Sequence, residues 1–128
     1  MKKFFTLTLI MLWTCQVYAY PQEKDSVYKR AEIEPVPSVG NDSLINFFES
    51  KIHSPSNLFA KERVFLYFIV RKDGTITDLK VLHGNNEDCN REALRVAETM
   101  PAWIPGQING KNVSVECVLP ILFLPKKK

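Results

Sequence analysis

The side chains with the most versatile chemistry beyond the first 19 residues of this sequence are two histidines and two cysteines, His53, His83, Cys89 and Cys117. None of them lies in a nucleophile motif, and the chain has no glycine-rich loop of the kind that binds phosphate. Structural zinc sites place two ligands within a few residues of each other, and no pair among these four has such a spacing. The sequence therefore predicts no catalytic residue, no metal site and no cofactor, and we expect a protein without enzymatic activity.

The first 19 residues have the pattern of a secretory signal peptide. Lys2 and Lys3 precede an apolar run at residues 4–13, and Val17-Tyr18-Ala19 resembles a cleavage site. The run has about half of the roughly 20 residues that a bilayer-spanning helix needs. We expect export with cleavage after Ala19. Lipidation at Cys15, which follows a leucine three positions earlier, and retention of the leader as an anchor are the alternatives.

Removal of the leader would leave an even number of cysteines, Cys89 and Cys117. Exported proteins form disulfides, and a bridge here would close a loop of about 28 residues and add about 3 kcal/mol in the chain-entropy model. The alternative is that both residues are small apolar side chains of a core. The sequence leaves a Cys89–Cys117 disulfide open.

The charges do not form the basic surface of a nucleic-acid-binding protein. The 128-residue chain has 17 Lys and Arg and 14 Asp and Glu, a formal charge of +3. Five of the lysines lie at its two ends, Lys2, Lys3 and residues 126–128. Without them, 12 basic residues remain against 14 acidic ones, a net charge of about −2. We therefore expect no nucleic-acid partner and interpret the last lysines as a basic, solubilising tail.

Three apolar runs predict the strands of a sheet. Residues 64–70 are all β-branched, aromatic or aliphatic, and Asp73-Gly74 predicts a hairpin turn to a second strand at 76–82. Alternating apolar residues predict a last strand at 113–123, after a turn at Asn109-Gly110.

Two helices are predicted around this hairpin. Leu44 and Phe48 recur at helical spacing behind Asn41-Asp42-Ser43, three residues that favour N-caps. A second helical pattern covers residues 87–100 and ends before Pro101. The order helix, strand, strand, helix, strand predicts an α+β fold in which two helices pack on one face of a three-stranded antiparallel or mixed sheet.

The last strand is expected at an open edge of this sheet, where unpaired peptide groups allow another chain to add a strand. We expect an extended N-terminal arm at residues 20–40, a domain at residues 41–125 and the basic tail at 126–128. Phe65, Tyr67 and Ile69 should emerge on the sheet face opposite the helices. Such a patch is usually covered, and we expect the arm around residues 27–39, or a second protein, to cover it.

Several motifs occur in the order found in one protein family. A helix that ends at a proline is followed by a tryptophan, a Pro-Gly pair, a Gly-Lys turn and a valine-rich strand, and a hairpin with Asp-Gly precedes them. These residues are Asp73, Gly74, Pro101, Trp103, Pro105, Gly106 and Gly110. This pattern, over about residues 35–124, resembles the TonB C-terminal domain. In the simplest interpretation the glycines and prolines serve the turns, and Trp103 plugs the core.

The resemblance implies a periplasmic module that binds outer-membrane transporters. Such domains capture a short extended segment of the transporter, the TonB box, at the sheet edge and contribute to TonB-dependent transmembrane transport. The expected partner-binding residues are Asn112, Val113, Ser114, Val115, Glu116, Cys117, Val118 and Leu119. The expected partner is a transporter segment or another envelope protein, and a homodimer is a further expectation.

The sequence also departs from the family pattern. The family's Tyr-Pro after the first helix appears as Ser54-Pro55, and Glu62-Arg63 replaces its glycine before the first strand. An arm of about 20 residues reaches at most about 70 Å. We do not expect this chain to transmit force alone. The alternative function is a stand-alone envelope adaptor, or a self-pairing domain, with no energy-transducing role.

Overall fold

The computed structural model describes residues 26–126 of the chain. The predicted signal peptide, the Cys15 alternative, the first residues of the arm and the last two lysines lie outside the described residues. Within this part, the elements are β1 (Val27–Tyr28), β2 (Val36–Pro37), α1 (Asn41–Lys51), β3 (Glu62–Val70), β4 (Ile76–His83), α2 (Glu87–Ala97), β5 (Trp103–Ile104), β6 (Gly106–Ile108) and β7 (Lys111–Phe123). No helix of residues 26–126 has the length and apolar character needed to cross a membrane.

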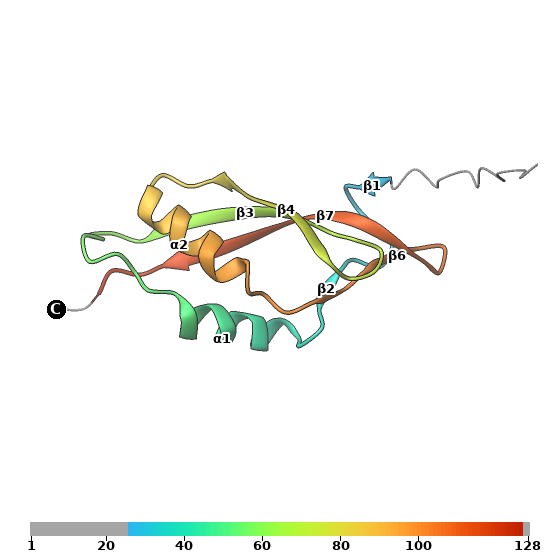
Figure 1. The fold of residues 1–128 in the computed structure, drawn as a ribbon, viewed down its shortest axis with the longest axis horizontal. Coiled ribbons are helices and arrows are strands. Elements are labelled where there is room, and N and C mark those ends of the chain that lie inside the picture. The colour runs from blue at the N-terminus through green and yellow to red at the C-terminus, as the bar shows by residue number, and fades with distance from the viewer. Residues whose placement is uncertain (1–25, 127–128) are drawn as a thin grey trace, which may run out of the picture.

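The three long strands form the sheet in the order β7–β3–β4, and β3 is antiparallel to both neighbours (Figure 1). The predicted α+β class and the element order of the long strands are confirmed. The strand count is not, because β1 and β6 also pair with β7, and β2 pairs with β5 in a separate two-stranded sheet. These additional strands have only two or three residues each, which is too short for a periodic apolar pattern.

Both helices cover the same face of the sheet, and the core lies between them and β3. Val64, Leu66, Phe68 and Val70 alternate along β3 and are almost completely buried, as predicted. They share one apolar cluster with side chains of both helices, of β7 and of the β5 segment. Those side chains are Leu44, Phe48, Cys89, Ala93, Val96, Ala97, Trp103, Ile121 and Phe123.

The ends of the helices differ from the prediction. If Asn41, Asp42 or Ser43 capped α1, the helix would begin at Asp42 or later. It begins at Asn41, so Gly40 occupies the N-cap position and no side chain caps the helix. α2 ends at Ala97 rather than near Met100. The Thr99 hydroxyl donates to the Val96 carbonyl (2.8 Å), and Met100 N–H donates to Ala97 (3.1 Å), so the chain leaves the helix through a tighter turn.

The loop between β3 and β4 depends on Gly74. Its φ of +85° lies in the region that favours glycine, and its carbonyl accepts a hydrogen bond from the N–H of Trp103 (3.2 Å). A Cβ atom on Gly74 would lie 2.5 Å from the Trp103 carbonyl oxygen. Trp103 is buried and packs edge-on against Phe68, with ring centroids 5.2 Å apart. The hairpin turn therefore also locks the predicted core tryptophan in place.

Gly74→Ala is expected to destabilise the domain more than Gly110→Ala does. Gly110 has a similar φ of +74°, but nothing lies within 4 Å of its Cβ position. The backbone penalty of about 1 kcal/mol applies to both variants, whereas the contact with Trp103 adds to it only at Gly74. Urea denaturation measures the difference. Equal losses in the two variants would show that the Trp103 contact relaxes at no cost.

The prediction that the arm covers the open sheet face is wrong for Phe65 and Tyr67, whereas cover by a second protein stays a prediction. The arm does not cross Phe65 and Tyr67, because its described strands pair with the edge of β7 and with β5. Both aromatic residues remain partly exposed, although Ile69 is buried. Polar neighbours flank Tyr67 instead: its hydroxyl donates to Glu116 Oε1 (3.0 Å), and the Lys80 ammonium lies 4.7 Å from its ring centroid.

Candidate functional site

The strand predicted to bind a partner, β7, pairs with β3 over its whole second half. The register runs from Val115, opposite Val70, to Phe123, opposite Glu62, without interruption. β7 therefore has one side committed to the sheet, and any added strand must approach from the other side. The orientation of its peptide groups decides which residues face that outer side.

The peptide groups of β7 alternate between the two sides. The N–H of Arg71, just after β3, donates to the Thr75 carbonyl, just before β4 (2.8 Å). Even-numbered residues of β3 therefore direct their peptide groups the other way, toward β7. They pair with odd-numbered residues of β7. Consequently, the N–H and C=O groups of the even-numbered residues of β7, such as Glu116, Val118 and Leu122, point outward.

The position of Pro120 is consistent with outward-facing peptide groups at the even-numbered residues of β7. Its register partner is Phe65, and its even number places it among the residues that face outward. A proline has no N–H to donate, so it is tolerated where that group would point away from the neighbouring strand. The proline within an alternating apolar run was the sequence signal for an edge strand with this orientation. Pro120 also interrupts the outward row of donors after Val118.

The beginning of this edge is occupied by the chain's own arm. β1 runs parallel to β7, with Val27 opposite Ser114 and Tyr28 opposite Val115. The predicted docking row at residues 112–119 is therefore not open throughout, and the expectation is wrong for Ser114 and Val115. The sequence does not predict this pairing, because two residues cannot show a strand period.

The first two residues of the predicted row have another role. Asn112 and Val113 pair with β6 across the two-residue turn Asn109-Gly110. Both turn residues have positive φ, 52° and 74°, as this hairpin type requires. The pair next to such a turn is hydrogen-bonded, so β6 adjoins the odd-numbered residues and lies on the same side of β7 as β3. The free outer edge therefore runs from Glu116 to Leu122.

The arm is fastened at two further points. Ile33 exchanges hydrogen bonds with Gln107 of β6 (N···O 3.1 and 2.9 Å), and the backbone N–H of Ser38 donates to Ala102 (3.2 Å). A Cβ atom on Gly106 would lie 2.9 Å from the Ile33 carbonyl oxygen, so a glycine is needed where the arm crosses. The glycine of the Pro105-Gly106 pair in the family pattern is therefore explained by the close approach of two backbones.

Breaking the β1 pairing is expected to expose the outward amide of Ser114. In a Val27→Pro, Tyr28→Pro variant the arm loses both donors of β1, and Ser114 should lose up to about tenfold in hydrogen-exchange protection, the equivalent of one hydrogen bond. Val115 is an internal control, because its amide faces β3. A Val27→Ala, Tyr28→Ala variant keeps the donors and should protect Ser114 better. Unchanged protection in the proline variant would contradict the pairing.

The opposite edge of the sheet is irregular. The β3–β4 register shifts between Phe65 and Leu66 and again between Tyr67 and Ile69. Asp78 has a φ of +57°, and its carboxylate accepts from the Arg71 guanidinium (2.9 Å), which holds the bulge. Bulges at an edge prevent regular pairing with a further strand. The free part of β7 is therefore the more regular of the two edges.

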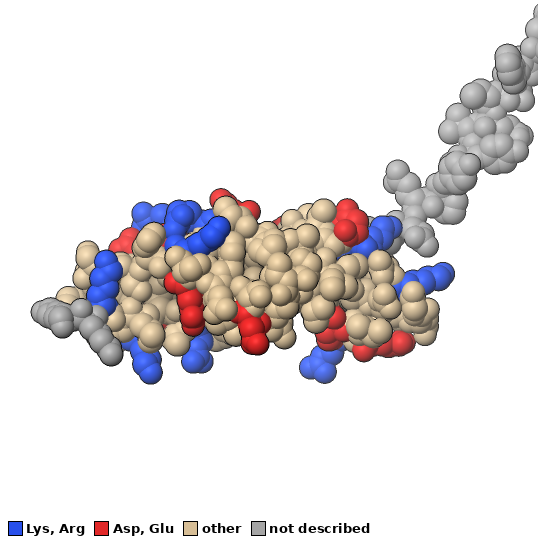
Figure 2. Space-filling model, turned by 90° about the horizontal axis from the view of Figure 1, so that it is seen from below, with Lys and Arg blue, Asp and Glu red and all other residues tan. Residues whose placement is uncertain are grey.

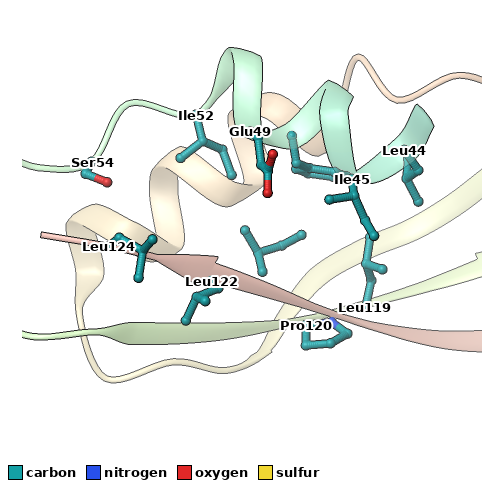
Figure 3. A pocket seen from close by; sticks show the side chains of 11 residues that line it. Leu44, Ile45, Glu49, Ile52, Ser54, Leu119, Pro120, Leu122 and Leu124 are labelled. Atoms are coloured by element: carbon teal, nitrogen blue, oxygen red, sulfur yellow. The ribbon is translucent and has the colours of Figure 1, made fainter. Parts of the chain in front are cut away.

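An apolar groove of about 470 Å³ lies beside the free edge, between α1 and the second half of β7 (Figure 3). Its apolar walls are formed by Leu44, Ile45, Phe48, Ile52, Leu119, Pro120, Ile121, Leu122 and Leu124, and it also contains Ser54 and Glu49. Ile45, Val118, Leu122 and Leu124 are about half exposed. The sequence does not predict this groove, because the spacing between a helix and an edge strand is a tertiary property.

Contacts between the two helices hold α1 beside the groove. The Arg95 guanidinium donates to the Lys51 carbonyl at the end of α1 (3.1 Å), and the N–H of His53 donates to Glu92 Oε1 (3.0 Å). Arg95 also donates to Glu92, and this interaction lowers the pKa of that carboxyl. The end of α1 is thereby tied to α2.

Cys89 and Cys117 are both free, so the disulfide that the sequence left open is not formed. Cys89 lies at the start of α2, which packs over β3 and β4, whereas Cys117 lies on β7, with β3 between them. Burial raises the pKa of Cys117 to about 11, and the nearby Glu34 carboxylate acts in the same direction. Burial also raises the pKa of Cys89. Both thiols are protonated at neutral pH and have the character of core residues.

Figure 2 shows charged side chains of both signs scattered around an uncharged middle area, without a single large basic patch on that face. Within residues 26–126, no three histidine, cysteine, aspartate or glutamate side chains are grouped so that they could hold a metal ion. The arrangement of β7 and its groove is suited to binding an extended, largely apolar chain segment.

The chain was compared with protein-family models, with solved structures and with curated proteins, and the first two comparisons found a match. The family model of the Gram-negative bacterial TonB protein C-terminal matches residues 61–125. Among solved structures, the chain is similar to the solution structure of the Helicobacter pylori TonB C-terminal domain, with 24% identity and a TM-score of 0.47, over 72% of this chain and 89% of that one. The comparison with curated proteins found no match.

Proposed function

Because this chain belongs to the family of Gram-negative bacterial TonB C-terminal domains, we propose that it binds an extended segment of an outer-membrane transporter. The family comprises protein-interaction modules associated with TonB-dependent transport. In the proposed complex, the transporter's TonB box adds as a strand to the outer side of β7, at residues 116–119. The complex contributes to TonB-dependent transport.

The observation that carries this proposal is the free outer edge of β7. The peptide groups of Glu116 and Val118 point outward between two limits, the β1 pairing at Ser114–Val115 and the missing donor of Pro120. Main-chain hydrogen bonds along a sheet edge supply affinity, and pockets for alternate side chains supply specificity. The groove next to α1 is such a pocket.

The proposal includes the location and division of the chain. A leader at residues 1–19 is removed after Ala19, and the protein works in the periplasm with an arm at residues 20–40, a domain at 41–125 and a basic tail at 126–128. The intact mass of the exported protein tests this step, because cleavage after Ala19, lipidation at Cys15 and an uncleaved leader give three different masses.

Isothermal titration with a synthetic TonB-box peptide tests the binding function. We expect saturable heat with the peptide and none with a version in which every second residue is N-methylated, because methylation removes the donors on one side of the added strand. No heat with either peptide at high micromolar concentration would contradict the proposal. That result would favour the stand-alone envelope adaptor or self-pairing domain.

A further inference from the structure

Among the described residues that line the groove, Glu49 alone carries a charge. Figure 3 shows its carboxylate between Ile45 and Ile52, directed from α1 into the groove above β7. No hydrogen bond or ion pair joins the side chain of Glu49 to another residue within the described range 26–126. A solvent-exposed acceptor without a side-chain partner therefore faces a groove whose walls are apolar apart from Ser54.

This carboxylate restricts what the groove can bind. An apolar side chain placed over Glu49 would remove water from the charge and provide nothing in exchange, which costs free energy. A lysine or arginine side chain has an apolar stem for the walls of the groove and a charged end for the carboxylate. Electrostatic complementarity of this kind selects among partners more strongly than it raises total affinity.

The position of the groove indicates a polypeptide rather than an acyl chain. Leu122 and Pro120 line it, and they belong to the outward-facing residues of β7, so peptide groups that need hydrogen bonds border the apolar walls. A strand added here directs alternate side chains into the groove. The others lie on the open face beside Val118, which is also apolar.

We propose that the segment recognised at this edge is apolar on both sides and carries one lysine or arginine, which enters the groove and pairs with Glu49. This inference rests on the function proposed above, since it requires strand addition to β7. It specifies the partner by its charge and position: one basic residue among aliphatic ones, on the side of the added strand that faces α1.

The test is a thermodynamic cycle by isothermal titration. Two peptides of alternating valine and isoleucine differ in one groove-facing residue, lysine or its uncharged isostere norleucine. Wild-type protein is expected to prefer the lysine peptide by roughly two- to fivefold at low salt, the range of a partly exposed ion pair. The preference should decrease in 0.5 M salt and disappear in Glu49→Gln. Asp42→Asn, which removes a charge from α1 outside the groove, should retain it.

The outcomes separate this inference from the function on which it rests. If both peptides bind equally to wild-type protein and to Glu49→Gln, the charge pairing is wrong while strand addition stands. If neither peptide binds, strand addition itself fails. Sedimentation at the titration concentrations covers another occupant: a dimer that Glu49→Gln dissociates would assign the groove to a second copy and overturn the inference. A preference that survives in Glu49→Gln would also overturn it.

Discussion

Val118→Pro is expected to reduce the affinity for a TonB-box peptide by more than about tenfold while leaving the domain folded. The N–H of Val118 points outward, so its removal takes no hydrogen bond from the β3 ladder, as at the natural Pro120. An added strand loses this donor, which is worth about 0.5–1.5 kcal/mol. The proline ring also occupies part of the 4.8 Å space that the strand needs.

Val118→Ala is the matched control, because it shortens the half-exposed side chain and keeps the donor. We expect it to bind within a few-fold of wild type, since an exposed side chain contributes little. Titration gives the affinities, and urea denaturation shows that both variants are folded. Retained affinity in a folded Val118→Pro protein would contradict binding at the β7 edge.

Phe68→Ala is expected to lower the free energy of unfolding by about 3–5 kcal/mol, the usual cost of removing a buried phenylalanine. Phe68 is fully buried at the centre of β3, where it contacts Trp103 and faces the helices. Domains of this size are stable by only about 5–15 kcal/mol, so the variant should be close to unfolding at 37 °C.

The matched control is Phe59→Ala, because Phe59 is 93% exposed and Phe68 is 0% exposed. The control should change stability by less than about 0.5 kcal/mol. Denaturation in urea, monitored by tryptophan fluorescence, measures both variants. A loss below 1 kcal/mol in Phe68→Ala would mean that the core collapses around the gap, contrary to the tight packing described above.

The long elements could be predicted from the sequence because their signals are local. The seven apolar residues at 64–70 read as a strand without any knowledge of their neighbours, and Asp73-Gly74 and Asn109-Gly110 provide the positive φ angles of two turns. β1 and β2 were beyond such reasoning. Their residues are strands only because β7 and β5 lie next to them.

The candidate site was predicted in part. The choice of β7 as an edge strand follows from the order of the elements, and Pro120 could have fixed the outward orientation of its even-numbered residues. The groove, the position of Glu49 and the separation of Cys89 from Cys117 depend on how α1 and α2 lie across the sheet. Helix placement is set by many distant contacts, so no local pattern carries it.

The bulged β4 strand has a consequence for the way in which copies of this molecule can associate. Endless stacking would need the β7 margin of one copy to meet the β4 margin of the next, and the irregular register at Asp78 disfavours that contact. Two β7 margins can still meet across a two-fold axis, which closes the assembly after two chains. The domain thus has an open strand edge on β7 that can bind another strand, without the head-to-tail geometry from which fibres grow.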